Sequence, residues 1–130
     1  MNEQPRTHLE INPELCGEVV ALAVGRAQVE LVATSVMAAD ERGLVHGGFV
    51  FGLADYAAML AVNDPNVVLG AAEARFLAPV TVGQKIIAYA EVEEEAGKKR
   101  RVEAYAKVGD VEVFRAKFTA FVLEKHVLDQ

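Results

Sequence analysis

The longest apolar stretch of the chain runs from about Gly47 to Val62 and places hydrophobic or small residues on every face of a helix. A helix that is apolar all round has to be buried. One charge, Asp55, lies at its middle. The stretch stops at 63–65, where an asparagine can cap a helix and a proline cannot continue one. The pattern therefore predicts a long buried helix over 47–62 that carries a single carboxylate.

Strand patterns lie on both sides of this helix. Before it, two runs rich in Val, Leu and Ala are separated by Gly25-Arg26, which predicts a hairpin. After it, turn residues separate four more runs, and the third alternates apolar with polar residues from Val102 to Val108. In the second, either Ile87 and Tyr89 or the neighbouring alanines face inward. The expected strands are 18–24, 27–37, 67–77, 85–95, 101–108 and 111–123.

The order of these elements predicts an α+β domain in which a curved antiparallel sheet wraps around one long buried helix. The whole chain, 1–130, is expected to be one domain, with 1–16 as a loosely attached arm because this segment is polar and contains two prolines. One sheet covers only one side of a helix that is apolar all round. The other side must meet more protein, so we expect a dimer.

Composition narrows the classes of function. Half of the 130 residues are hydrophobic and a quarter are charged, which is typical of a compact domain. A net charge of −6 argues against nucleic acid as a partner. Cys16 is the only cysteine and no cluster of residues has metal-ligand spacing, so neither a disulfide nor a metal site is predicted. The first residues are not a secretory signal, and the apolar stretch is too short to cross a bilayer, which predicts a cytoplasmic protein that binds no membrane.

A turn of small residues opens the predicted helix. His46 precedes Gly47 and Gly48, and the first N–H groups of a helix have no intrahelical acceptor and carry the positive end of its dipole. The two glycines leave room for a ligand oxygen to approach the backbone. Such donors can hold an oxyanion, and a carboxylate in a dry pocket can act as nucleophile or general base. Together these groups indicate acyl transfer to water.

The spacing of these groups adds a constraint. Asp55 lies eight residues after Gly47, which places it roughly 12 Å further along the helix. The two groups cannot reach one carbonyl within one chain. If both act on one substrate, Asp55 has to come from the neighbouring subunit, and the chemistry requires the dimer that burial already suggests.

The same residues carry a family resemblance. His46-Gly47-Gly48 followed by Leu53-Ala54-Asp55 resembles the HGG…LAD signature of hot-dog-fold acyl-CoA thioesterases of the phenylacetate-pathway (PaaI) type. The segment 73–79, Glu-Ala-Arg-Phe-Leu-Ala-Pro, resembles the "FLRP" strand end of that family. The order and length of the predicted elements agree with it from about residue 17 to residue 123. The resemblance implies a hot-dog fold, subunits joined edge to edge, and two composite sites per dimer.

The resemblance also implies roles for single residues. Gly47 would donate its N–H to the thioester carbonyl, Asp55 would attack or activate water, and His46 would help to position the thioester. Asp40, six residues before the histidine, and Arg75, which could replace an arginine that is Ala78 here, would contact the substrate together with Gly48. No separate cofactor is implied, because coenzyme A is part of the substrate.

Several alternatives stay open at this point. Asp55 could be a structural residue that is hydrogen-bonded across an interface. The basic run 98–101 could bind the phosphates of coenzyme A, but we favour a solvated hairpin turn in which its charges pair with the glutamates at 93–95. A hot-dog hydratase or dehydratase and a non-catalytic acyl-CoA sensor are the alternative functions. The acyl group, its carrier, the choice between nucleophile and general base, and the choice between a dimer and a tetramer are not determined by the sequence.

Overall fold

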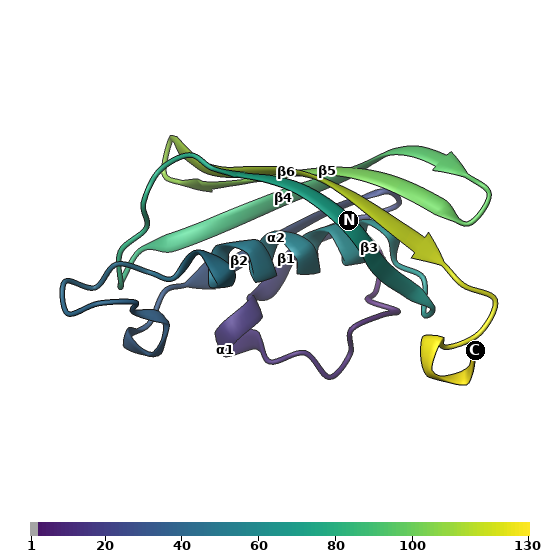
Figure 1. Ribbon diagram of the computed structural model, residues 1–130, viewed down its shortest axis with the longest axis horizontal. Coiled ribbons are helices and arrows are strands. Elements are labelled where there is room, and N and C mark those ends of the chain that lie inside the picture. Colours follow the sequence, from purple (N-terminus) through teal and green to yellow (C-terminus); the bar gives the residue numbers. More distant parts are fainter. Residues whose placement is uncertain (1–2) are drawn as a thin grey trace.

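The computed structural model describes residues 3–130 and contains a six-stranded sheet, one long helix and three short helical segments. The sheet lies on one side of the long helix and the N-terminal arm lies on the other (Figure 1). This arrangement confirms the predicted hot-dog fold. The elements in chain order are α1 (Pro13–Cys16), β1 (Glu18–Ala23), β2 (Arg26–Val32), η1 (Ser35–Met37), α2 (Gly47–Val62), β3 (Val67–Phe76), β4 (Lys85–Ala96), β5 (Lys99–Val108), β6 (Val111–Val122) and η2 (Val127–Asp129).

Helix α2 has the bounds that the apolar stretch predicts. Its last turn is closed by Asn63 in the left-handed conformation (φ 52°), and the Asn63 N–H donates to the Met59 carbonyl at 2.8 Å. Asparagine tolerates this conformation better than most residues, which is why the helix ends here. At the other end the N-cap is His46, whose side chain makes no capping hydrogen bond.

The strands form one antiparallel sheet in the order β1-β2-β4-β5-β6-β3. Register shifts interrupt four of the five strand pairs. Such bulges bend a strand and increase its twist, so the sheet can curve around α2. β1 and β3 are the edge strands.

A row of alanines crosses the concave face of the sheet beneath α2. The row passes from β2 through β4, β5 and β6 to β3, and each alanine stands opposite the next in the strand register. Its members are Ala27, Ala90, Ala104, Ala116 and Ala74. Because a methyl group projects little from the sheet, the helix can approach closely, and its own alanines (Ala54, Ala57, Ala58 and Ala61) are buried as well.

The register decides which face of β4 is buried. Ile86, Ala88 and Ala90 are buried, whereas Tyr89 lies on the convex face with its ring stacked on Tyr105 at 5.0 Å. The alternative that placed Ile87 and Tyr89 inside is therefore wrong. A tyrosine at this position would not fit between the sheet and a helix seated on alanines.

Two predicted strand ends differ from the structure by more than one residue. β2 ends at Val32 instead of residue 37: its last register partner is Lys85, the first residue of β4, and the chain then turns into η1. β5 begins at Lys99 instead of residue 101, because the turn is confined to residues 97 and 98.

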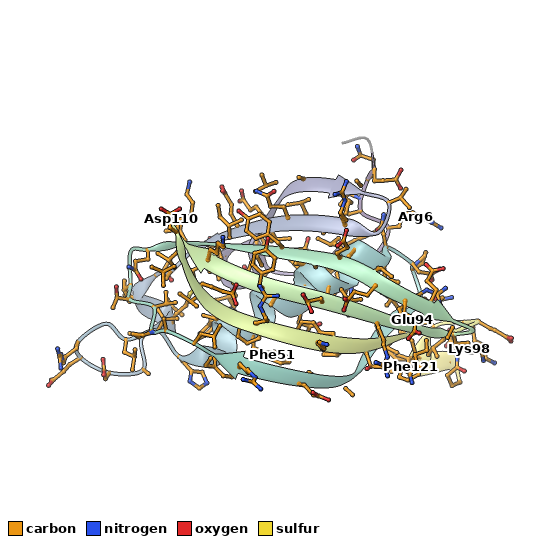
Figure 2. The ribbon with its side chains drawn as sticks, turned by 90° about the horizontal axis from the view of Figure 1, so that it is seen from above. Arg6, Phe51, Glu94, Lys98, Asp110 and Phe121 are labelled. Atoms are coloured by element: carbon orange, nitrogen blue, oxygen red, sulfur yellow. The ribbon has the colours of Figure 1, made fainter. Side chains whose placement is uncertain are left out.

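The basic run at the start of β5 lies in the β4–β5 hairpin. Figure 2 shows Glu94 and Lys98 together at one end of the sheet and Asp110, in the β5–β6 turn, at the other. Arg100 and Arg101 pair with glutamates of β4 at 3.5 Å and 3.3 Å. This pairing agrees with the favoured interpretation of the run as a charged hairpin.

The described part of the N-terminal arm, residues 3–16, makes specific contacts, although a loose attachment was expected. Thr7 is 5% exposed, and Asn63 bonds the arm backbone through both ends of its side-chain amide. The arm and α1 cover part of the side of α2 that faces away from the sheet (Figure 1). Part of the cover that we expected from a second subunit therefore comes from the chain itself.

Candidate functional site

The turn before α2 is held by backbone hydrogen bonds from two other segments. The Val45 N–H donates to the Val80 carbonyl at 2.8 Å, and the His46 N–H donates to the Met37 carbonyl at 2.9 Å. The Phe49 N–H donates to the His46 carbonyl. Within residues 3–130 no acceptor is bonded to the N–H groups of Gly47 and Gly48. The helix therefore opens on two backbone donors in a fixed position.

Gly47 borders an apolar cavity of about 370 Å³. A Cβ atom on Gly47 would lie only 3.0 Å from the ring of Phe76, so a side chain at this position would press on the cavity wall. Phe76 is 59% exposed and contacts Phe114 edge to face, with ring centroids 5.1 Å apart. The lining residues are Val45, Gly47, Val50, Phe76, Leu77, Ala78, Pro79, Val80 and Val113.

Asp55 lies half-buried in the middle of α2. Its Oδ1 atom is buried and has no hydrogen-bond partner within residues 3–130. Burial raises the pKa of its carboxyl group from 3.8 to about 6, because the charged form loses hydration. A buried carboxylate oxygen without a partner is costly, so this atom requires a partner from outside the chain or a functional explanation.

Asp55 belongs to an open stripe on α2. Gly48, Phe51, Gly52 and Asp55 follow the i, i+3, i+4, i+7 spacing of one helix face, and none of them is fully buried. A Cβ atom on Gly52 would meet no atom within 4 Å. Phe51 packs against the rings of Phe114 and Phe118 of β6, so the small residues Gly48 and Gly52 form the open part of this face next to Asp55.

The unbroken helix keeps Gly47 and Asp55 apart. Eight residues of regular α-helix separate them, which corresponds to roughly 12 Å. The predicted spacing therefore holds in the structure, and one chain does not bring the two groups together.

His46 stands at the mouth of the helix. Its side chain is exposed and contacts Phe49 edge to face at 6.2 Å. The ring also lies above Gly48, where a Cβ atom would be 3.1 Å from it. His46 is thus adjacent to the two backbone donors, as expected for a residue that positions a ligand there.

Two other predicted substrate contacts, Asp40 and Arg75, are exposed side chains. Asp40 is exposed and accepts two hydrogen bonds within its own loop, from the N–H groups of Arg42 (2.9 Å) and Leu44 (3.1 Å). Arg75 is exposed and stands opposite Arg115 in the register. Because the next residue along β3 packs against the core, Arg75 points to the convex face of the sheet, away from Gly47.

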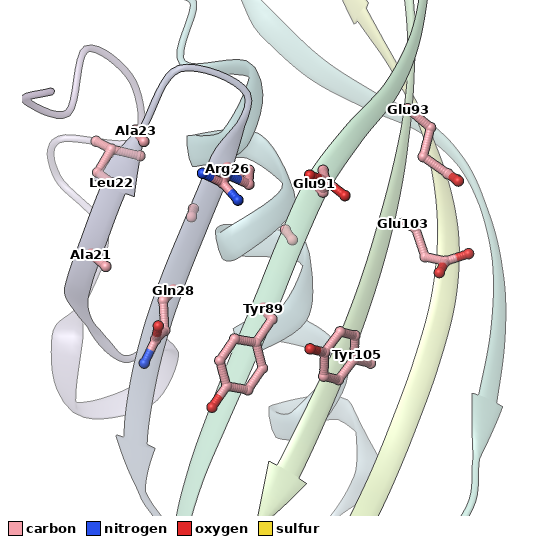
Figure 3. A pocket seen from close by; sticks show the side chains of 12 residues that line it. Ala21, Leu22, Ala23, Arg26, Gln28, Tyr89, Glu91, Glu93, Glu103 and Tyr105 are labelled. Carbon is pink, nitrogen blue, oxygen red and sulfur yellow. The ribbon is translucent and has the colours of Figure 1, made fainter. Parts of the chain in front are cut away.

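A second cavity, of about 500 Å³, lies on that convex face. Figure 3 shows Tyr89 and Tyr105 side by side, with Glu91, Glu93 and Glu103 further along the strands and Arg26 and Gln28 on β2. The lining of this second cavity includes none of the predicted site residues. Within residues 3–130 no group of three or more His, Cys, Asp or Glu side chains could hold a metal ion. In the same part of the chain, no helix is both long and apolar enough to span a bilayer.

Two residues near the candidate site were not singled out from the sequence. Phe76, within the strand-end segment of the resemblance, forms a wall beside Gly47. Burial of the Cys16 thiol raises its pKa, and the negative charge of Asp55 raises it further. The position of Phe76 in the quoted motif was a usable signal, whereas nothing local in the sequence connects Cys16 to a residue 39 positions later.

Comparison with known families agrees with the fold and with the motif at the start of the helix. Residues 42–116, more than half of the chain, match the thioesterase superfamily. The chain therefore belongs to the thioesterase superfamily.

The chain is also similar to solved structures over most of its length. The chain is 51% identical to an uncharacterized protein from Pyrococcus horikoshii, with a TM-score of 0.97 and 99% of both chains covered. It is 26% identical to a mutant of the phenylacetic acid degradation protein PaaI from Thermus thermophilus, with a TM-score of 0.77, covering 84% of this chain and 95% of that one. The PaaI-type resemblance is thus confirmed.

Curated relatives include longer proteins. Over 92% of its length the chain is 52% identical to 26% of a methylthioribose-1-phosphate isomerase from Aquifex aeolicus. Over 91% of its length it is 30% identical to 60% of the transcription factor FapR from Caldanaerobacter subterraneus. The chain therefore spans about a quarter and about three fifths of the curated relatives that it matches.

The buried carboxylate predicts a pH-dependent effect of Asp55→Asn on stability. With a pKa of about 6 in the folded chain and about 3.9 in the unfolded one, the folded protein binds more protons between these values. The contribution of Asp55 to stability therefore falls as the pH rises through this window and is constant above it. We expect Asp55→Asn to gain about 2–3 kcal/mol in free energy of unfolding, relative to wild type, between about pH 4 and pH 8. Urea unfolding across this range measures the difference, and a difference independent of pH would contradict the prediction.

Proposed function

We propose that the protein is an acyl-CoA thioesterase that acts as a homodimer. In each site the Gly47 N–H of one subunit polarises the thioester carbonyl, and Asp55 of the partner subunit activates water or attacks. The observation that carries the proposal is the unpartnered Oδ1 of Asp55 on the same helix as the backbone donors of Gly47 and Gly48. A carbonyl held at one helix and a carboxylate supplied by the other would satisfy both.

The chemistry follows from these two groups. As a general base, the carboxylate takes a proton from water while the hydroxide attacks the carbonyl carbon, and the resulting oxyanion is held by the helix N–H donors. The carbon–sulfur bond then breaks, the thiolate of coenzyme A takes up the proton, and a free acid remains. As a nucleophile, the carboxylate would instead attack the carbonyl carbon and displace the thiolate of coenzyme A, which takes a proton from solvent, and water would then hydrolyse the resulting mixed anhydride and release the carboxylate and the free acid. A pKa of about 6 suits the first role, because the base is ionised at neutral pH without being too weak.

Three surfaces support the dimer and the choice of substrate. Within residues 3–130 the edge strand β3 has one side without a strand partner, and such an edge can pair with a second copy. The open stripe on α2 ends at Asp55. The cavity beside Gly47 is lined by apolar side chains, which favours an apolar acyl group. Pairing of two dimers into a tetramer, and a place in the cytoplasm, stay predictions.

A non-catalytic acyl-CoA sensor is the second candidate, and the similarity to the transcription factor FapR favours it. In that case the same cavity would bind acyl-CoA without turnover. Asp55 distinguishes the two functions, because binding alone gives no reason to bury a carboxylate oxygen without a partner.

The first test is hydrolysis. A panel of acyl-CoAs with apolar acyl groups of increasing size is offered to wild type and Asp55→Ala, and release of the free thiol is followed. We expect wild-type turnover and a loss of at least about 10²-fold in the variant, because a general base contributes that much. Full activity in Asp55→Ala would refute the assignment, and tight binding of an acyl-CoA without turnover by wild type would favour the sensor.

The role of the Gly47 N–H can be tested by a pair of substitutions. Gly47→Pro removes the N–H, and proline is well tolerated at the first position of a helix. The preceding His46 already has the extended conformation (φ −63°, ψ 131°) that a following proline requires. Gly47→Ala is the matched control, since its Cβ atom meets Phe76 in the same way but the N–H remains. We expect kcat of the proline variant to lie about 10²–10³-fold below that of the alanine variant. Equal kcat values would exclude this donor.

The composite site predicts that two inactive variants restore each other. When Asp55→Ala and Gly47→Pro chains are produced together, random pairing makes half of the dimers mixed, and each mixed dimer has one intact site, or about a quarter of wild-type activity in the population. If both groups acted within one chain, no mixture would recover activity. The measurement is hydrolysis by the mixed preparation, compared with each variant alone.

A further inference from the structure

The cavity beside Gly47 has a lining of one chemical kind. Within residues 3–130, every residue that borders it is a glycine, a proline or an apolar residue, and none carries a charged group, a hydroxyl or an amide side chain. The turn that opens α2 contributes Val45 and Gly47, and the chain after β3 contributes 77–80. A polar group that entered this space would lose its hydration without finding a side-chain partner. The cavity therefore suits an uncharged hydrocarbon group.

Phe76 supplies the aromatic wall of this cavity. It is the last residue of β3 and stands opposite Phe114 in the strand register, where the two rings meet edge to face with centroids 5.1 Å apart. Its ring also lies against Gly47, since a Cβ atom there would be 3.0 Å from Cε2 and 3.3 Å from Cδ2 of the ring. Because Gly47 is the first residue of α2, the ring stands beside the backbone donor that would hold an acyl carbonyl.

The ring of Phe76 is supported from behind by a buried aromatic cluster. Phe114 is fully buried and also contacts Phe51 of α2, with centroids 6.1 Å apart. Phe51 in turn contacts the buried Phe118 at 5.5 Å. A protein interior packed in this way leaves no free space for another ring. The wall that Phe76 forms therefore cannot move back into the core.

The other side of Phe76 is open. The side chain is 59% exposed and that of Leu77 is 50% exposed, although both are large and apolar. The Leu77 N–H donates to the Val113 carbonyl at 2.8 Å, which fixes the chain where it leaves β3. The exposed apolar surface is thus held in a defined position next to the cavity, where an apolar ligand can cover it.

We propose that Phe76 sets the upper limit on the length of the acyl group, and that the acyl groups accepted are uncharged aliphatic chains. The inference rests on the proposed thioesterase function. When the carbonyl oxygen is held by the Gly47 N–H, the first carbons of the acyl chain lie beside the Phe76 ring, and the cavity of about 370 Å³ takes up the rest. Phe76 contacts the chain and takes no part in bond breaking, so it determines specificity.

The test measures how the length of the acyl chain affects hydrolysis and binding. Straight-chain acyl-CoAs of increasing length are offered to wild type, Phe76→Ala and Phe76→Leu, and kcat/KM is measured for each. Calorimetry gives the affinity for matching S-(2-oxoalkyl) thioethers of coenzyme A. In these compounds a methylene group separates the carbonyl from the sulfur, so they keep the acyl chain and are not hydrolysed.

Phe121→Ala is the matched control. Phe121 lies on β6, and its ring covers Gly70, where a Cβ atom would be 2.5 Å away. Phe121 does not line the cavity, and it lies toward the β4–β5 hairpin, at a distance from Phe51 along the sheet (Figure 2). The control therefore removes an aromatic ring from the sheet and leaves the wall beside Gly47 in place.

The expected result is a shift of the length limit. In wild type, kcat/KM and affinity rise with chain length until the cavity is filled, and the next methylene costs about 10-fold or more. In Phe76→Ala this drop comes at a longer chain, because removal of the ring opens the wall. The drop for Phe76→Leu lies between the two, and this milder variant serves if Phe76→Ala does not fold. Phe121→Ala keeps the limit of wild type.

The lining also predicts discrimination by charge. Butyryl-CoA and succinyl-CoA have carbon chains of equal length, but the succinyl group ends in a carboxylate. We expect kcat/KM for succinyl-CoA to be at least about 10²-fold lower, because the carboxylate would lose its hydration against side chains that offer it no partner. Equal values for the two substrates would contradict the assignment of uncharged acyl groups.

Two results overturn the role of Phe76. One is an identical length limit in wild type and Phe76→Ala. The other is an affinity for the thioethers that never exceeds the affinity for coenzyme A itself, which would mean that the acyl chain lies outside the cavity. Failure of the proposed function is a separate result. If no acyl-CoA is hydrolysed, the thioesterase assignment fails, while binding of the thioethers still reports the length limit.

Discussion

The contact on which the rest of the structure depends is the seating of α2 on the row of alanines that crosses the sheet. Small side chains on both partners let a helix without a polar face lie in a curved sheet, and close packing of this kind supplies most of the stability of a small domain. The seat holds the helix against the concave face of the sheet. It therefore fixes where the two N–H donors at one end and the carboxylate at the middle are presented.

A helix held so firmly separates its functional groups and cannot bring them together by bending. Gly47 and Asp55 stay about 12 Å apart, and the buried oxygen of Asp55 has no partner within the described chain. The same rigidity makes the helix a dependable frame for other parts of the molecule. The N-terminal arm is anchored at Asn63, at the end of the helix, and docks on the middle of the helix.

Local patterns predicted much of this structure. The bounds of α2, its end at Asn63 and the succession of helix and strands along the chain followed from residues adjacent in sequence, because capping, proline and alternation act over a few positions. The inward face of β4 did not, since Ile87 and Tyr89 are as apolar as Ala88 and Ala90 and only the space beneath α2 decides between them. Arg75 and Cys16 were equally out of reach. Strand register places the first on the convex face, and the second is influenced by a carboxylate 39 positions later in the sequence.

The alanine seat also divides the domain into a part that resists substitution and a part that tolerates it. Adding volume anywhere along the row would lift α2 from the sheet, at a cost of about 1–3 kcal/mol for each overpacked position. The cavity beside Gly47 lies outside the row and is bounded by Phe76, Val113 and the segment 77–80. Its size and shape can be changed there without moving the helix. The fold can therefore diversify what it binds at one end while its centre stays the same.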